Sequence, residues 1–248
     1  MMKRPTLDVR GGRGVRGFSL LESLISLLIF FLIFAGSLEF FGTVRRVFFR
    51  LQSRQENRQA AWAALDKIRT DILAAGQGLA RPMRLGLLAP VEQIDGRWVL
   101  VRTEASPPLS ADPRAGWTTL AVVESDEDWA GRTVCLYDKI KGESAIIRSS
   151  ENGILTLSSP LRYDYLASES AAAVLRTTAV YLDAGQNVLR RKTDLSPAQP
   201  LLEDVCSFAF FFDSGTCLAE TRLSLASEPE ESYALKILAR NAALGKPF

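Results

Sequence analysis

Residues 17–22 read Gly-Phe-Ser-Leu-Leu-Glu, which places a carboxylate at the start of an otherwise apolar stretch. Between residues 18 and 42 the only ionisable side chains are Glu22 and Glu39. A stretch of this length predicts a membrane-spanning helix, since about 20 apolar residues cross the hydrocarbon core. A lone carboxylate in such a helix costs on the order of a few kcal/mol unless something pairs with it. We therefore interpret Glu22 as a functional group that needs a partner.

The segment before this helix is basic. Its cations are Lys3, Arg4, Arg10, Arg13 and Arg16, against the single carboxylate of Asp8. The positive-inside rule predicts that this leader stays in the cytoplasm and that the remainder lies outside. Arg45, Arg46 and Arg50, on the far side of the apolar stretch, oppose this orientation to some degree.

Two other interpretations of the N-terminus are an ordinary secretory signal peptide and a plain signal anchor. The apolar run is about twice as long as the central region of a typical signal peptide. No small-residue cleavage site of the Ala-x-Ala kind follows it at the usual distance. A plain signal anchor would leave Gly17 and Glu22 without a role.

Gly17 followed by Phe18, with a glutamate at the fifth position counted from Phe18, resembles the processing site of type IV prepilins and pseudopilins. In that family a membrane-embedded aspartyl peptidase cuts after the glycine and N-methylates the new terminal residue. The resemblance implies cleavage between Gly17 and Phe18 and N-methylation of Phe18. The implied partner of Glu22 is then the Phe18 amine of the same or a neighbouring subunit. The positive end of the helix dipole also favours a carboxylate there.

Apolar residues recur at spacings of three and four beyond the membrane segment, which predicts an amphipathic helix. They are Val44, Val47, Phe48 and Leu51, followed by Ala61, Leu65, Ile68, Ile72 and Ala75. The mostly polar stretch 50–59 separates the two groups, so we expect the helix to leave the bilayer, cross water and dock on a domain. Gly76, Gly78 and Pro82 are expected to end it, since glycine suits a helix C-cap and proline cannot continue a helix. Two helices with a hinge near Gly42 are the alternative.

The remainder of the chain has the pattern of short strands, rich in branched and aromatic residues and separated by turn residues. The predicted strands are 98–102, 118–124, 133–137, 144–148, 154–157, 173–182, 188–192, 205–212, 218–225 and 233–239. Asn152-Gly153 predicts a hairpin turn, and residues 183–187 predict another. The expected fold class is α+β, a pilin-like arrangement with one long helix packed on an antiparallel sheet.

The order of these segments resembles that of PilW-like minor pilins and their relatives, the ComGF and J-type pseudopilins. The resemblance covers residues 55–76, the closing strands from residue 180 to residue 213, and Ala239-Arg240-Asn241. Residues 81–132 match no segment of these proteins. We divide the chain into a cleaved basic leader (1–17), a transmembrane and fibre-core helix (18–42), an amphipathic helix joining anchor to head (43–76), and a β-rich head (77–248).

Composition narrows the possible chemistry. The 248-residue chain contains no histidine, so histidine-based triads and histidine-ligated metal sites are excluded. The acidic cluster Glu124, Asp126, Glu127 and Asp128 lacks the alternating ligands and the glycine of an EF-hand loop. We interpret it as a solvated loop and expect no cofactor and no metal. The formal net charge of +2 gives no reason to expect a nucleic-acid partner.

The three cysteines are Cys135, Cys206 and Cys217. A bridge between Cys206 and Cys217 would be worth roughly 2 to 3 kcal/mol in loop closure. A tight turn at Ser214-Gly215 would instead set Phe212 opposite Cys217. The sequence therefore leaves a Cys206–Cys217 disulfide and buried free thiols as open alternatives, with Cys135 unpaired in either.

The resemblance implies a minor pilin of type IV pilus assembly that serves as a priming or tip subunit, with no enzymatic activity. It implies partners in other minor pilins, the major pilin, the prepilin peptidase and the inner-membrane assembly platform. It also implies a bacterial inner-membrane protein of a single pass, with its head in the periplasm until it enters a pilus or pseudopilus. A J-type subunit of type II secretion or a DNA-uptake pseudopilin is the alternative within this class. A membrane-anchored periplasmic enzyme or ligand-binding protein is the alternative outside it. For the pilin we expect an exposed strand edge of the head to be the docking surface for the heads of other minor pilins.

Overall fold

The computed structural model describes residues 19–123 and 127–245. The chain divides into two compact units, Met1–Asn57 and Arg58–Phe248. Helix α1 (Leu20–Ala74) begins in the first unit and ends in the second. It is continuous through Gly42, so the long helix is confirmed and the alternative of two helices with a hinge at that residue is wrong.

In the first unit, α1 exposes its apolar side chains on every side. It is the one described helix that is long and apolar enough to cross a membrane. The hydroxyl groups of Ser26, Ser37 and Thr43 donate to the backbone carbonyl oxygens of Glu22, Ile33 and Glu39, at 2.8, 2.8 and 3.1 Å. These bonds satisfy the hydroxyl donors within the helix itself. This part of the chain therefore fits a single-pass membrane anchor.

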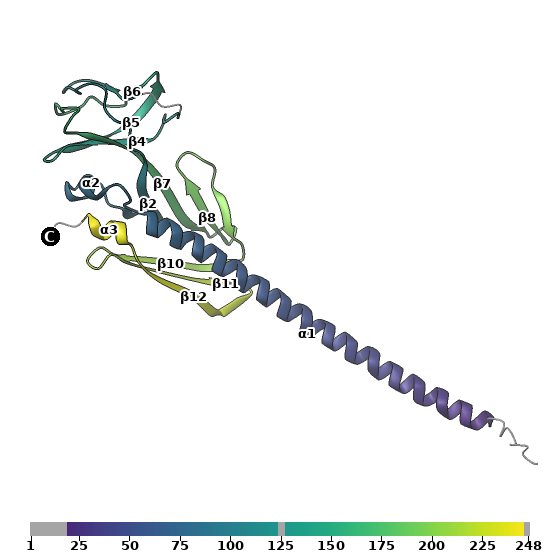
Figure 1. The fold of residues 1–248 in the computed structure, drawn as a ribbon. Coiled ribbons are helices and arrows are strands. Elements are labelled where there is room, and N and C mark those ends of the chain that lie inside the picture. The colour runs from purple at the N-terminus through teal and green to yellow at the C-terminus, as the bar shows by residue number, and fades with distance from the viewer. Residues whose placement is uncertain (1–18, 124–126, 246–248) are drawn as a thin grey trace, which may run out of the picture. The chain divides into compact units, whose positions relative to one another are not determined.

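In the second unit, the remainder of α1 buries one stripe. Its buried residues are Ala61, Ala64, Leu65, Ile68 and Ile72. The spacing of three and four predicted this face, and Ala75, which was predicted with it, is also buried just after the helix ends. The stripe is the centre of a large hydrophobic core to which both β-sheets contribute. Figure 1 shows this part of α1 between β10–β12 on one side and β7 and β8 on the other.

In the described residues of the second unit, α1 is followed by twelve strands and two short helices, whose arrangement Figure 1 shows. Their bounds are α2 (Ala80–Arg84), β1 (Val91–Ile94), β2 (Arg97–Ala105), β3 (Thr119–Ala121), β4 (Thr133–Tyr137), β5 (Gly142–Glu151), β6 (Ile154–Leu157), β7 (Ala171–Asp183), β8 (Val188–Thr193), β9 (Gln199–Leu202), β10 (Val205–Asp213), β11 (Leu218–Leu225), β12 (Glu228–Leu238) and α3 (Arg240–Leu244). Each of the ten predicted strands overlaps one of these, and β4, β6 and β11 have the predicted bounds. The strands β1 and β9 and both short helices were not predicted.

The strands form two antiparallel sheets, where one sheet was predicted. The larger has nine strands, of which seven follow the order β1-β2-β7-β4-β5-β6-β3, and β8 joins β7 to β9. The long strand β7 is its centre, because one edge pairs with β2 while the other pairs first with β4 and then with β8. The smaller sheet has the order β10-β11-β12. The α+β class is confirmed, with the correction that the helix packs between two sheets.

The turns behave as their residues predict. Asn152 and Gly153 both adopt positive φ, 49° and 73°, between β5 and β6. This is the backbone geometry that a two-residue Asn-Gly hairpin turn requires. Between β7 and β8, the last turn residue, Asn187, also has a positive φ of 54°.

A second hydrophobic core lies away from α1, among β3–β6 and the loops beside them. Its fully or nearly fully buried residues include Leu120, Trp129, Ile147, Leu155 and Tyr165. The segment 106–170, between β2 and β7, supplies most of this core. Part of the region that resembled no known segment, residues 81–132, therefore belongs to a packed subdomain of its own.

Candidate functional site

Glu22 lies in the first turn of α1, the end where the helix dipole favours a negative charge. Its backbone N–H donates to the Ser19 carbonyl oxygen at 3.0 Å. The side chain is exposed, and within residues 19–123 and 127–245 no cation lies within ion-pair distance of its carboxylate. Gly17 and Phe18, the predicted processing and methylation residues, lie outside the described residues. The geometry therefore presents Glu22 as an outward-facing carboxylate on an apolar helix.

The other end of the apolar stretch carries Glu39 and the first arginines. Arg46 donates through Nε to the Gly42 carbonyl oxygen at 3.3 Å, and the Arg45 guanidinium lies 5.5 Å from the centre of the Phe49 ring. Long cationic side chains near the end of a spanning helix reach toward water and head groups. These contacts fit a helix that leaves the membrane near residue 42.

The second unit holds its part of α1 through a partly buried ion pair. Arg191 on β8 donates from Nε to Asp71 Oδ2 at 2.6 Å and from Nη2 to Asp71 Oδ1 at 2.9 Å. The two side chains are 19% and 12% exposed. The hydrogen bond to Asp71 raises the pKa of Arg191 above its ordinary value. Neither residue was predicted to have this role.

The C-terminal end of α1 is held by α3 and β2. Asn241 on α3 donates from Nδ2 to the Leu73 carbonyl oxygen at 2.6 Å, satisfying one carbonyl that the helix end leaves free. The Gly76 N–H donates to the Val101 carbonyl oxygen at 2.7 Å. Gly76 has a φ of 80°, which glycine adopts without strain. The predicted glycine terminator of the helix is confirmed, although the helix itself ends at Ala74.

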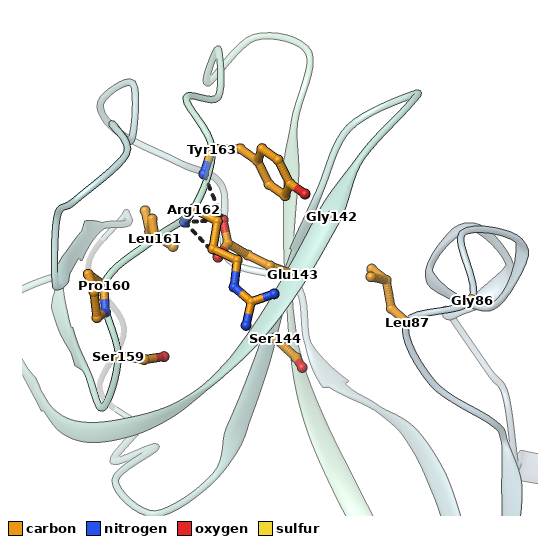
Figure 2. A pocket seen from close by; sticks show the side chains of 10 residues that line it. All are labelled: Gly86, Leu87, Gly142, Glu143, Ser144, Ser159, Pro160, Leu161, Arg162 and Tyr163. Carbon is orange, nitrogen blue, oxygen red and sulfur yellow. Dashed lines mark hydrogen bonds between the residues drawn. The ribbon is translucent and has the colours of Figure 1, made fainter.

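A polar pocket of about 580 Å³ lies between the turn at Gly86-Leu87, the start of β5 and the segment 159–163 (Figure 2). Its lining includes the side chains of Glu143, Ser144, Ser159, Arg162 and Tyr163. No residue of the pocket was predicted as a site. The sequence pattern does not indicate this pocket, because its residues come from three separate segments that carry no recognisable motif.

Glu143 is held in place in this pocket by the backbone (Figure 2). Its carboxylate accepts the Arg162 N–H at 2.9 Å and the Tyr163 N–H at 3.3 Å. It also accepts the Tyr165 hydroxyl at 3.2 Å. Burial, and then the charge of Glu143, raise the pKa of Tyr165 above its ordinary value.

The Lys141 ammonium lies 5.7 Å from the centre of the Tyr163 ring beside this pocket. Among the ten residues that line it, Glu143 is the one carboxylate and Arg162 is the one cation. Acid–base catalysis by a pair of carboxylates needs two carboxyl groups, and this lining has one. One fixed carboxylate beside one guanidinium is suited to holding a polar ligand.

All three cysteines are free thiols. Of the two alternatives for Cys206 and Cys217, the structure has the unbridged one, because the residues lie at opposite ends of the β10–β11 hairpin. Cys206 follows the first residue of β10, whereas Cys217 precedes β11, whose first residue pairs with Asp213. The seven residue-to-residue steps from Cys206 to Asp213 span roughly 23 Å of extended strand, too far for a disulfide. Cys206 is exposed, whereas Cys217 is buried, so the expectation of buried thiols is wrong for Cys206.

The acidic loop is only partly described, since Glu124 and Asp126 lie outside the described residues. Glu127 accepts the indole N–H of Trp129 at 2.9 Å, and Asp128 accepts the Ala130 N–H at 2.9 Å. These two carboxylates therefore serve local structure. In the described part of the chain, no group of three or more Cys, Asp or Glu side chains is arranged to hold a metal ion.

No family profile matches the chain, and no curated protein matches it. Two solved structures are similar to part of it. The gp54 tailspike of Acinetobacter baumannii bacteriophage AP22, in complex with A. baumannii capsular saccharide, is 14% identical with a TM-score of 0.28, over 31% of this chain and 15% of the tailspike. The tailspike protein gp49 of Pseudomonas phage LKA1 is 18% identical with a TM-score of 0.25, over 28% of this chain and 14% of the tailspike. TM-scores this low do not establish a shared fold, and these similarities carry no functional conclusion.

Proposed function

We propose that this chain is a minor pilin, a membrane-anchored subunit that inserts its N-terminal helix into a type IV pilus or a related pseudopilus. Prepilin peptidase would cut between Gly17 and Phe18 and methylate the Phe18 amine. The helix anchors the chain in the bacterial inner membrane before assembly, with the head in the periplasm.

The observation that carries this proposal is that the two parts of α1 differ: the first exposes apolar side chains, and the second buries a stripe in the head. The exposed large apolar side chains of the first part of α1 run from Leu20 to Leu51 and need lipid or other helices around them. Residues 61–72 bury a separate stripe in the head. One helix thus serves both as an anchor and as part of the core of a folded domain.

The position of Glu22 supports the same proposal. In the proposed fibre, the Phe18 amine and the Glu22 carboxylate would be opposite charges within an apolar helix bundle. Such a pair offsets the cost that either charge would have alone in the absence of water. Priming the fibre and occupying its tip are the roles that we assign to the subunit within the assembly. Other minor pilins, the major pilin and the inner-membrane assembly platform are its proposed partners.

An anchored ligand-binding protein is the second candidate, because the pocket around Glu143 and Arg162 offers fixed polar groups in a hollow of about 580 Å³. The two candidates differ in what happens to the N-terminus. A binding protein needs only its anchor, whereas a pilin must lose its leader before it assembles.

Replacing Gly17 by a bulky residue tests the assembly role. We expect the native chain to have the mass of residues 18–248 plus one methyl group and to appear in sheared fibres. Gly17→Trp should stay at full length in the membrane and be absent from fibres. Gly36→Trp, in α1, is the control for leader removal, since nothing lies within 4 Å of a Cβ added there. Normal shortening of Gly17→Trp, or a native chain that keeps its leader, contradicts the proposal.

A further inference from the structure

Strand β10 has an open edge beside a groove. Within the described residues, β10 pairs with β11 along one edge and with no second strand along the other. At the start of this second edge, the Val205 N–H donates to the Asn187 carbonyl oxygen at 2.8 Å. Residues 208–213 form one wall of a groove of about 570 Å³. Gln93, Gly96, Trp98 and Leu182 form the rest of its lining.

The groove lies beside the strand. Side chains on a strand alternate between its two faces, so a hollow over one face would be lined by every second residue. This groove is instead lined by all six consecutive residues from Phe208 to Asp213. It therefore runs along the edge of β10, where the N–H and C=O groups that do not bond to β11 point.

The other edge strands carry features that prevent pairing with a further chain. β1, β3 and β9 have only four, three and four residues, and β9 contains Pro200. β12 begins with Glu-Pro-Glu-Glu, which places proline and charge on that edge. β10 has nine residues, no proline and no charge before Asp213. Among the described edges, β10 is the one that is both long and unprotected.

The backbone groups and side chains that line the groove indicate what kind of ligand it would bind. Unpaired backbone groups along an edge are matched by the backbone of another extended chain. The rings of Phe208 and Phe212 are half-buried in the lining, and Trp98 lies 4.7 Å from Phe210 between ring centres. The lining contains no cation and one carboxylate, Asp213, at its end. It therefore offers nothing that would recognise a phosphate or an acidic ligand.

We propose that β10 binds an extended strand of a partner polypeptide in this groove, with uncharged residues whose apolar side chains alternate along the strand. The added strand would continue the sheet β12-β11-β10 by one member. Its apolar side chains would lie against Phe208, Phe212 and Trp98. This inference stands on the head alone and does not depend on the role in fibre assembly.

The test uses the full chain in detergent micelles and a fluorescent nine-residue peptide of alternating threonine and valine with a lysine at each end. The matched probe is the same peptide with every backbone nitrogen methylated, which keeps the side chains and removes the N–H donors. We expect saturable binding of the first peptide by fluorescence anisotropy and at least about tenfold weaker binding of the second. Hydrogen exchange should slow in residues 208–213 when the first peptide binds.

Two variants separate this edge from the rest of the sheet. Phe211→Lys places a charge on the β10 edge at a side chain that is 59% exposed, so the fold should be unchanged. Leu238→Lys makes the same change on β12, where the side chain is 48% exposed. We expect Phe211→Lys to weaken peptide binding by about tenfold and Leu238→Lys to leave it unchanged. Equal binding of the two peptides, protection away from β10, or no binding at about 1 mM peptide would overturn the proposal.

Discussion

Asp71 and Arg191, 120 residues apart in the chain, hold each other through two hydrogen bonds between α1 and β8. The pair is largely shielded from water, and both oxygens of Asp71 are engaged. A shielded pair of this geometry stabilises a unique arrangement chiefly because either partner alone would be costly. It fixes the helix segment 58–74 against the larger sheet at one position.

Asp71→Ala should therefore destabilise the second unit by about 3 kcal/mol, because it leaves the Arg191 guanidinium without its partner. Replacing both residues by leucine should recover part of that loss. Denaturant unfolding, followed by circular dichroism, measures both. The control is Asp66→Ala on the same helix, whose contact with Arg69 is long, 3.6 Å, and exposed. That change should alter the free energy of unfolding by no more than about 0.5 kcal/mol, and an equal effect of the two substitutions would show that the ion pair has no special role.

Glu22→Ala should leave leader removal and the folded head intact while reducing recovery in sheared fibres by at least about tenfold. The reason is the loss of the group proposed to offset the Phe18 amine. Glu39→Ala is the matched control, since it removes the other exposed carboxylate of the same apolar segment. Quantitative immunoblots of sheared fibres compare them. Equal recovery of Glu22→Ala and the parent chain would show that Glu22 has no role in fibre assembly.

Gly76→Ala should cost clearly more stability than Gly86→Ala. Both glycines have positive φ, 80° and 70°, so alanine is strained by about 1 kcal/mol or more at either. At Gly76 the added Cβ would also lie 3.0 Å from the backbone nitrogen of Ala242, whereas nothing lies within 4 Å at Gly86. Thermal unfolding of the two variants measures the difference. Equal shifts in Tm would mean that α3 yields freely at this contact.

The three thiols should react at different rates. Cys206 is exposed and should be alkylated in the native chain at pH 8, whereas Cys135 and Cys217 should react only after unfolding. Mass spectrometry without reductant counts the labels, and three labels after unfolding are expected. One label would reveal a Cys206–Cys217 disulfide.

Burial also makes Cys135 a source of alkaline instability. It raises the pKa of this thiol from 9.0 to about 12. Because the folded chain holds the proton more tightly, the contribution to stability is complete below pH 9 and is lost as the pH rises toward about 12. Cys135→Ala should show less of this loss than the parent chain. Identical pH profiles between pH 9 and pH 11 would contradict the assignment.

The sequence predicted the elements whose residues carry a complete local pattern. The spacing from Ala61 to Ala75 specified the buried face of α1 because a helix repeats every 3.6 residues. β6 and its turn followed from Asn152-Gly153. By contrast, β1 buries only Val91 of its four residues, and β9 contains Pro200, which argues against a strand.

Contacts between segments far apart in the sequence could not be predicted from local residue patterns. Asp71 and Arg191 each look like an ordinary charged residue within its own element, and only the folded chain brings them together. The division into two sheets has the same origin, since the strands of both are similarly apolar and their pairing is decided by tertiary packing. The pocket around Glu143 depends on the backbone amides of residues 162–163, and no side-chain motif predicts where backbone amides will lie.

The segment 106–170 lies between β2 and β7, which are neighbours in the larger sheet where Ala105 pairs with Val174. It adds β3–β6 to the same sheet through the pairing of β4 with β7. Its two ends are thus neighbours, and it has a hydrophobic core of its own. A segment with adjacent ends and a separate core can change in the loops between its strands while β4 keeps its pairing with β7. The head therefore combines a core built around α1 with an inserted segment whose loops can vary without disturbing that core.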